Sequence, residues 1–173
     1  MKNKSKTKGK NGERELVRIL DEIFGEKFGR VFGSGLLTGG KNQEKIEKLN
    51  EIQILSSTGD IIPPEKFKNF VFECKWYKDF QWFKLFKEKH FSLLENENGW
   101  ISQISKISNE KKWFLCMKFN HQGWFVLVDK ENVNFDENFL TDLTYLRWYS
   151  SKYDRFFYIF ELKKFFEKYK ELL

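Results

Sequence analysis

The chain of 173 residues is long enough for one compact domain with a core of its own. Its 40% hydrophobic and 32% charged residues exclude an intrinsically disordered or collagen-like chain, and no apolar run reaches the roughly 18 residues of a membrane-spanning helix. The net charge is +6, and residues 1–12 contain five lysines and no acidic residue. The basic surplus therefore lies in a short N-terminal arm, which is typical of segments that bind nucleic-acid phosphates but also fits a solubilising tail.

Residues 12–28 are predicted to form an amphipathic helix, because their apolar residues recur with the helical period. Glu13 falls at the centre of the apolar face, so its carboxylate is expected to point towards whatever that face packs on. Glu15 falls on the opposite side of the helix and is expected to be solvated.

The strongest strand prediction is residues 69–76, a short segment rich in β-branched and aromatic residues. Side chains alternate between faces along a strand, which places Glu73 and Lys75 on one face and Cys74 on the other. A shorter strand is expected at residues 59–62. The other predicted strands are residues 30–35, 51–55, 113–119, 123–128 and 156–160; helices are predicted over 79–94, from 100 onwards and over 161–173, with an irregular segment over 130–152.

Cys74 and Cys116 lie in apolar runs, where reduced and buried thiols are usual, so no disulfide framework is expected. Together with His90 and His121 they lack the paired spacing of a zinc site. No apolar secretory segment follows the basic start of the chain. A cytoplasmic location is expected, in the host cytoplasm if a phage encodes the protein.

Asp60 stands 13 residues before Glu73, in a short strand expected to lie beside the strand of Glu73 and Lys75. Two carboxylates held close together repel each other, and a hard divalent cation with oxygen ligands removes that repulsion. A neighbouring lysine can orient or deprotonate a water molecule, or stabilise charge on a phosphoryl oxygen. The pattern points to metal-dependent phosphodiester hydrolysis; a simple ion pair between Glu73 and Lys75 at a sheet edge is the alternative.

The order of these residues resembles that of the PD-(D/E)xK nuclease superfamily, and within it the archaeal-type Holliday junction resolvases and their phage relatives. The resemblance covers about residues 8–128. It implies an α/β fold with an αβββαβ core, in which helices flank a central mixed sheet. The matching residues are Lys8-Gly9, Glu13 to Val17 at the start of a helix, Arg30 followed by Gly33-Ser34-Gly35, Asp60-Ile61-Ile62, Glu73-Cys74-Lys75, and Gln103.

The resemblance also implies a role for each matching residue. Asp60, Glu73 and the Cys74 carbonyl would hold Mg²⁺, for which Mn²⁺ is expected to substitute, and Glu13 would complete the acidic cluster. Lys75 would position or activate the attacking water. Ser34 would lie near the scissile phosphate and Gln103 beside the lysine, although a turn serine and a polar residue at a helix edge explain these two equally well. The residues expected to contact DNA are Lys6, Lys8, Lys10, Arg14 and Arg30.

The expected organisation is a basic arm over residues 1–12, a nuclease core over 13–128 and a C-terminal extension over 129–173 that packs on the same domain. Three features depart from the resolvase pattern. Gly59 replaces the proline before the acid, the segments after Gly35 and Lys75 are longer than in the archaeal enzymes, and residues 129–173 have no recognised counterpart. These departures affect the expected substrate more than the expected chemistry.

The function that follows is a homodimeric, metal-dependent endonuclease that resolves four-way DNA junctions, with no membrane partner and no small-molecule cofactor. One alternative is a structure-specific, restriction or repair endonuclease of the same superfamily that acts on duplex or flap DNA. The other is a non-catalytic nucleic-acid-binding module with the same fold. The tryptophans are expected mainly in the core, and Trp82 and Phe83 are the candidates for stacking on DNA bases.

Overall fold

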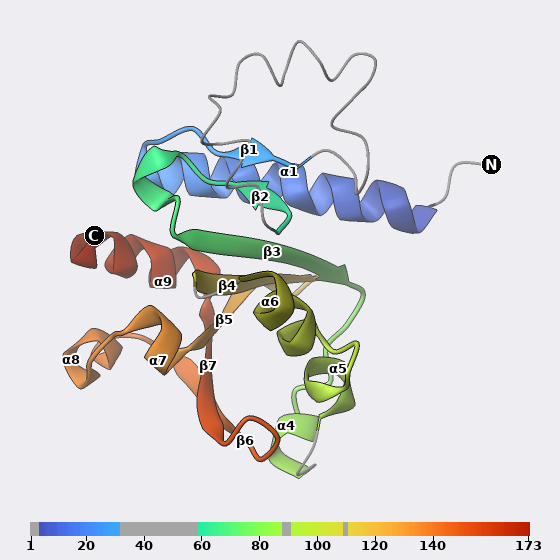
Figure 1. The fold of residues 1–173 in the computed structure, drawn as a ribbon. Coiled ribbons are helices and arrows are strands. Elements are labelled where there is room, and N and C mark those ends of the chain that lie inside the picture. The colour runs from blue at the N-terminus through green and yellow to red at the C-terminus, as the bar shows by residue number, and fades with distance from the viewer. Residues whose placement is uncertain (1–3, 32–58, 88–90, 109–110) are drawn as a thin grey trace.

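The computed structural model describes residues 4–31, 59–87, 91–108 and 111–173. The strands are β1 (Gly29–Arg30), β2 (Ile61–Ile62), β3 (Phe70–Tyr77), β4 (Lys112–Phe119), β5 (Gly123–Asp129), β6 (Tyr145–Ser150) and β7 (Arg155–Glu161). The helices are α1 (Lys4–Phe24), η2 (Glu65–Phe67), α4 (Lys84–Lys87), α5 (Ser92–Glu95), α6 (Trp100–Ser108), α7 (Lys130–Val133), α8 (Glu137–Leu140), α9 (Leu162–Tyr169) and η3 (Lys170–Leu172). The strands form one sheet in the order β1-β2-β3-β4-β5-β7-β6 (Figure 1).

The sheet is mixed, because β3 and β4 are parallel while the other neighbouring strands are antiparallel. Parallel neighbours require a long crossover connection, which here runs through α4, α5 and α6. Within the described residues, α1 is followed by β1, β2 and β3, and the crossover that ends with α6 leads to β4. This α/β architecture, with helices flanking a central sheet, confirms the predicted fold class.

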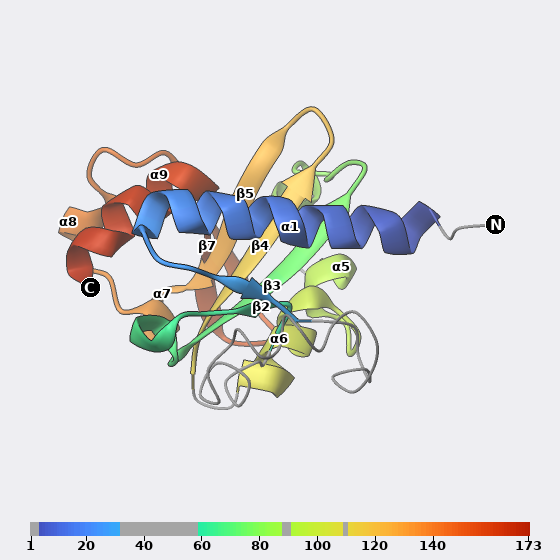
Figure 2. The same ribbon diagram turned by 90° about the horizontal axis from the view of Figure 1, so that it is seen from above.

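One face of the sheet is covered by α1 and α9, which lie side by side in both views (Figures 1 and 2). Leu16 and Leu20 of α1 and Phe166 of α9 are fully buried in one cluster with Phe72 of β3. The Phe72 and Phe166 rings lie 6.0 Å apart. The period of the apolar residues in α1 thus decides which side of the helix meets the sheet.

The opposite face is covered by α6 and the short helices before it. Ile104 of α6 is buried with Val71 of β3 and Leu115 of β4. Val71 and Phe72 are neighbours in the chain and belong to different clusters, because successive strand residues point to opposite faces. Glu73 and Lys75 share the face of Val71, which is the face of α6.

The helix predicted over residues 12–28 begins earlier, at Lys4, and ends at Phe24. Lysine is a good helix former, so the basic segment continues the amphipathic helix upstream. At Gly12 the helix comes so close to β3 that an added Cβ would lie 3.2 Å from Cε3 of Trp76. A side chain at this crossing would have to displace the Trp76 ring by a few tenths of an ångström.

Two other predictions were wrong. The helix predicted over residues 79–94 is not continuous, because residues 79–83 are not helical and α4 and α5 are separate short helices. The irregular segment predicted over 130–152 contains α7, α8 and β6, with Asp129 and Asp136 accepting hydrogen bonds from the first backbone N–H groups of α7 and α8. The confirmed predictions are the strands at 59–62, 69–76, 113–119, 123–128 and 156–160 and the helices from 100 and over 161–173.

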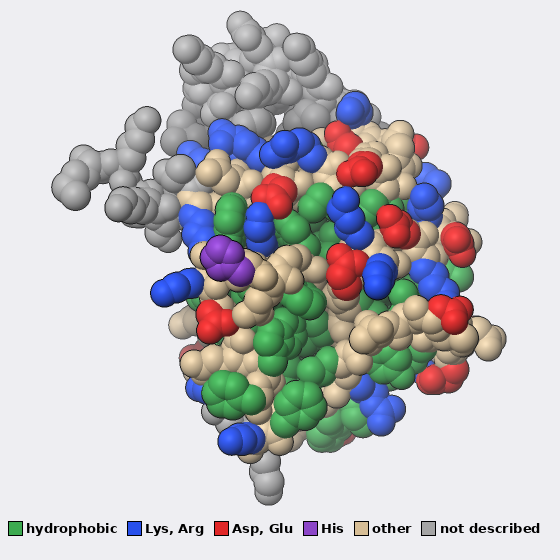
Figure 3. Space-filling model, turned by 180° about the vertical axis from the view of Figure 1, so that it is seen from behind, with side chains coloured by type: hydrophobic (Ala, Val, Ile, Leu, Met, Phe, Trp, Pro, Cys, Tyr) green, Lys and Arg blue, Asp and Glu red, His purple; other side chains and the backbone are tan. Residues whose placement is uncertain are grey.

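Of the strand predicted over 30–35, Arg30 belongs to β1 and Val31 is not in a strand. Residues 32–35, and the strand predicted over 51–55, lie outside the described residues. Residues 129–173 contribute β6, β7 and α9 to the same sheet and core. No helix in the described ranges is both long and apolar enough to cross a membrane. Figure 3 shows hydrophobic side chains gathered in the lower half of the face seen from behind, and alternating acidic and basic side chains above them.

Candidate active site

Three hydrogen bonds hold Asp60 in place, two of them to β3 and one to Val31, the residue after β1. Its backbone N–H donates to the Phe72 carbonyl at 3.0 Å, and its carbonyl accepts from the Val31 N–H at 3.0 Å. Its side-chain Oδ2 accepts from the Cys74 N–H at 2.9 Å. Both the backbone and the carboxylate of Asp60 are thus attached to the strand that carries Glu73.

Gly59 makes this approach possible. It has a φ of +90°, and an added Cβ would lie 2.7 Å from the Phe72 carbonyl oxygen. A proline, whose φ is held near −65°, could not adopt this backbone. The glycine found where the resolvase pattern has proline is therefore required by the way this chain enters β2.

The edge of β3 beyond Phe72 faces the candidate site. β2 pairs with β3 only at Ile61 and Phe72, and the Cys74 N–H beyond this pair is bound by the Asp60 side chain. The N–H and C=O of one strand residue point to the same side. The Cys74 carbonyl therefore lies on the same side of β3 as the Asp60 carboxylate.

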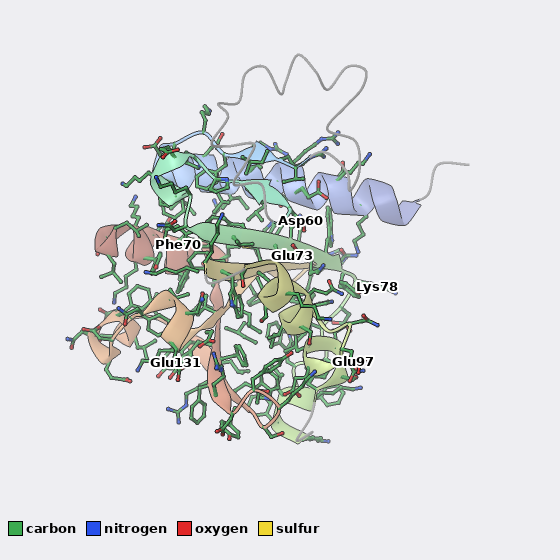
Figure 4. All side chains as sticks on the ribbon, in the orientation of Figure 1. Asp60, Phe70, Glu73, Lys78, Glu97 and Glu131 are labelled. Atoms are coloured by element: carbon green, nitrogen blue, oxygen red, sulfur yellow. The ribbon has the colours of Figure 1, made fainter. Side chains whose placement is uncertain are left out.

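Glu73, Lys75 and Gln103 converge on the α6 side of the sheet, and Figure 4 marks Asp60 and Glu73 at this point. The Lys75 Nζ atom donates to Glu73 Oε1 at 2.8 Å and to Gln103 Oε1 at 2.9 Å. The Gln103 amide Nε2 donates to the Asn98 carbonyl at 2.7 Å, which holds the side chain with its oxygen towards the lysine. The Lys75 and Glu73 side chains are 20% and 10% exposed, so the pair is largely withdrawn from water.

Asp60 and Glu73 have raised pKa values. Burial is the main cause for both residues, and the charge of Asp60 raises the pKa of Glu73 further. The Cys74 N–H and the Lys75 ammonium oppose the shift at Asp60, and Lys75 opposes it at Glu73. The two carboxyl groups lie close enough to share a hydrogen bond, and a second carboxyl group at such a distance perturbs the pKa of the first.

The donor atoms at this point fit a divalent metal ion. Two carboxylates and a backbone carbonyl are oxygen donors, which Mg²⁺ and Mn²⁺ prefer. Among the residues that the structure describes, no group of three His, Cys, Asp or Glu side chains is placed to hold a metal. The oxygen donors that could hold such an ion at this point are the Asp60 and Glu73 carboxylates and the Cys74 carbonyl.

Glu13 lies beside this pair without joining it. Its Oε2 is 3.2 Å from Nε of Arg30, and the Glu13 and Arg30 side chains are 20% and 12% exposed. Burial raises the pKa of Glu13, Arg30 opposes this shift, and the charge of Asp60 adds to it. Glu13 thus contributes to the negative charge near Asp60 while its own carboxylate is paired with Arg30.

The predicted DNA contacts lie on different flanks of α1. Lys10 and Arg14 are exposed, and Arg30 reaches the same flank, where its Nη1 donates to the Lys10 carbonyl at 3.2 Å. Lys8 lies on another flank, with its Nζ 5.4 Å from the centre of the Trp76 ring. The side chain of Lys6 and all of Ser34 lie outside the described residues.

Glu15 was wrongly predicted to be solvated. Its carboxylate pairs with Lys118 Nζ on β4 and accepts from Trp124 Nε1 on β5 at 2.9 Å. The Lys118 Nζ also lies 4.2 Å from the centre of the Trp76 ring. Burial acts to raise the pKa of Glu15, but the hydrogen bonds from Lys118 and Trp124 hold it below its usual value. No local pattern reveals this contact, because its members lie more than 100 residues apart.

Cys74 and Cys116 are free thiols, as predicted. They face each other in the paired register of β3 and β4. Burial raises the pKa of both thiols well above the usual value, so both are protonated at neutral pH.

The comparisons with known proteins agree with this geometry at the level of the family. A family model described as "Phage putative PDDEXK endonuclease" matches residues 4–172, which is nearly the whole chain. A search of curated proteins and a search of solved structures each gave no match. Membership indicates a nuclease that acts on DNA, in a superfamily that generally uses divalent metal ions. The chain belongs to this family of phage PDDEXK endonucleases.

Proposed function

We propose that this protein is a divalent-metal-dependent endonuclease that hydrolyses phosphodiester bonds in DNA, with Mg²⁺ as its ion and Mn²⁺ as an effective substitute. The observation that supports it best is the convergence of Asp60, Glu73 and Lys75. The buried Glu73 carboxylate and the partly buried Asp60 carboxylate both have raised pKa values, and the Lys75 ammonium lies beside them. The match of nearly the whole chain to an endonuclease family supports the same chemistry.

Each of these residues has its own proposed role in hydrolysis. Asp60, Glu73 and the Cys74 carbonyl would hold the ion, which when bound lowers the pKa of water and stabilises charge on the phosphoryl oxygens. Lys75, held between Glu73 and Gln103, orients the attacking water or stabilises the developing negative charge through its ammonium group.

The surroundings of the site suit a DNA strand. The exposed Lys10 and Arg14, with Arg30 beside them, bind phosphates on the flank of α1 next to the site. Glu13 fixes the position of Arg30 through their ion pair. These contacts involve the DNA backbone, so we expect cleavage to depend on the path of the strand more than on its sequence.

We further propose that the substrate is a four-way DNA junction and that the enzyme acts as a homodimer. The support is the ordered resemblance of Glu13, Asp60, Glu73, Lys75 and Gln103 to the junction resolvases. Each protomer has one candidate site for one strand. Two protomers related by a twofold axis would cut a junction at two symmetric positions.

The test compares cleavage of labelled four-way junction, linear duplex, flap and single strand in Mg²⁺, Mn²⁺ or EDTA. We expect paired symmetric nicks in the junction in the presence of either metal, and a dimer mass by light scattering. Asp60→Asn and Glu73→Gln should abolish cleavage and retain junction binding. The matched control is Glu65→Gln, which removes an exposed carboxylate paired with Lys68 at the surface.

Each part of the proposal has its own contrary result. Equal cleavage of junction and duplex would exclude junction specificity and leave the nuclease chemistry intact. Binding without cleavage of any substrate in either metal would identify a non-catalytic module. Full activity in Asp60→Asn would contradict the assigned ligand set.

A further inference from the structure

We propose that the cavity beside Trp82 accepts one unpaired nucleobase of the DNA substrate. The inference rests on the proposed function only in taking DNA as the ligand. The cavity lies where the segment before α4 meets β5, β6 and β7, far along the sheet from Asp60. It has a volume of about 390 Å³ and is lined by Trp82, Phe125, Tyr145, Leu146, Ile159 and Thr144, among others.

The size and lining of the cavity fit a flat aromatic ligand. Its volume is at the low end of the range of about 300–1,000 Å³ for small-molecule sites. Its walls are mainly aromatic and aliphatic, and Thr144 adds a hydroxyl group. A nucleobase has apolar faces and a polar edge, so it matches aromatic walls with polar groups at the margin.

The Trp82 ring is held in place before any ligand binds. Its Nε1 donates to Gln122 Oε1 at 2.9 Å, and Gln122 Nε2 donates in turn to Asp79 Oδ1 at 2.8 Å. Its ring packs edge-on against Phe80 and Phe125, with centroid distances of 4.5 and 4.9 Å. A ring that is already immobilised can stack on a base without a further ordering cost.

The residues that follow Trp82 favour a polyanionic ligand. Phe83 is 55% exposed, and Lys87 Nζ lies 5.8 Å from the centre of its ring. Lys84 precedes Lys87 on the same short helix. Aromatic rings interleaved with lysines are typical of sites that bind unpaired nucleic acid, where bases stack and phosphates meet the cations.

The Glu161 carboxylate lines the cavity, but hydrogen bonds reduce its repulsion of a DNA ligand. Glu161 accepts hydrogen bonds from the Lys163 and Lys164 N–H groups at the start of α9. Its charge is therefore directed to the helix N-terminus. Lys87 of α4, in the segment that follows Trp82, is a cation that can meet the phosphates of a DNA strand bound at Trp82.

The test uses single-stranded DNA with one 2-aminopurine, whose fluorescence is quenched when the base stacks. Titration in EDTA measures binding without cleavage. We expect quenching by the unaltered protein, and a loss of affinity of about five-fold or more in Trp82→Leu. Because Trp82 also packs in the core, Tyr145→Ala is the second variant; Tyr145 lines the cavity and is 41% exposed.

The matched control is Tyr149→Ala, which removes a 46% exposed tyrosine from the same face of β6 outside the cavity lining. It should bind and quench as the unaltered protein does. Equal loss in Tyr145→Ala and Tyr149→Ala, or no quenching by the unaltered protein, would overturn the inference. The inference would also be overturned if Tyr145→Ala dissociated a dimer of the protein without reducing the quenching. The cavity would then be a contact with a second copy of the chain.

The proposed function can fail separately. A protein that quenches 2-aminopurine through Trp82 but cuts no DNA in Mg²⁺ or Mn²⁺ would keep this inference and lose the nuclease proposal. A protein that cuts DNA but leaves 2-aminopurine unquenched would do the reverse.

Discussion

The Nζ atom of Lys75 donates a hydrogen bond to Oε1 of Gln103 across 2.9 Å, although 27 residues separate the two in the chain. The bond joins the middle of the sheet to α6. Lys75 is thereby held between two acceptors, since it also binds Glu73. This arrangement fixes the direction of the ammonium group relative to the proposed metal ligands.

Gln103→Ala is expected to lower the cleavage rate about ten-fold with little change in DNA affinity, because a catalytic group that loses one of its contacts is misplaced by a fraction of an ångström. Gln103→Glu keeps an oxygen acceptor for Lys75 but loses the donor to the Asn98 carbonyl, so its activity should lie between that of Gln103→Ala and that of the unaltered protein. Single-turnover rates and binding isotherms separate the two effects. Ser105→Ala, on an exposed part of the same helix, is the control; a Gln103→Ala enzyme with the full rate would show that the bond has no part in catalysis.

The raised pKa values of Asp60 and Glu73 predict that the metal-free protein becomes less stable as pH rises. A carboxyl group with a raised pKa holds its proton more tightly in the folded state than in the unfolded state. Its contribution therefore favours folding below the usual carboxyl pKa and declines as pH rises towards the folded-state value. Urea unfolding at a series of pH values in EDTA should show this decline, and Asp60→Asn should reduce it.

Bound Mg²⁺ should restore the stability that the metal-free protein loses as pH rises. An ion that binds only the folded protein stabilises it, and it binds the ionised carboxylates, so Mg²⁺ should raise the unfolding free energy more at pH 7.5 than at pH 5.5. The measurement is the same unfolding curve with and without Mg²⁺. An equal effect of Mg²⁺ in the unaltered protein and in Asp60→Asn would place the ion elsewhere.

Gly59→Ala is expected to destabilise the protein more than Gly25→Ala does. Both glycines have positive φ angles, +90° and +67°, so each substitution costs about 1 kcal/mol in backbone strain. Only at Gly59 would the added Cβ collide, 2.7 Å from the Phe72 carbonyl oxygen, while Gly25 has nothing within 4 Å. Chemical denaturation measures the difference, and equal losses would mean that the loop before Asp60 shifts freely.

The Glu15 ion pair should stabilise the docking of α1 on the sheet. Glu15→Gln and Lys118→Met are each expected to lower the unfolding free energy, with a coupling energy of about 1 kcal/mol in a double-mutant cycle. Glu22→Gln is the control, because its carboxylate is 72% exposed and lies 3.6 Å from Lys163. Additive effects of the two substitutions would show that Glu15 and Lys118 act independently.

Much of the fold could be predicted because its signals are local. The apolar period of α1 depends on residues one or two helical turns apart. The alternation of faces in β3 depends on residues one or two positions apart. β6 was missed because it is a short edge strand whose alternation of buried and exposed residues is clear only beside β7. The segment at 79–83 was missed because Asp79 binds the backbone N–H of Phe80 at 2.8 Å, a local contact that competes with helix formation.

The order of Asp60, Glu73 and Lys75, and their meeting at one strand pair, could be predicted from strand alternation and from their spacing along the chain. Three contacts became visible only in the folded chain: Glu13 pairs with Arg30, Glu15 binds Lys118 and Trp124, and Trp82 borders a cavity. Each of these depends on contacts between elements distant in sequence. Such contacts follow from how helices and strands pack, which no local period encodes.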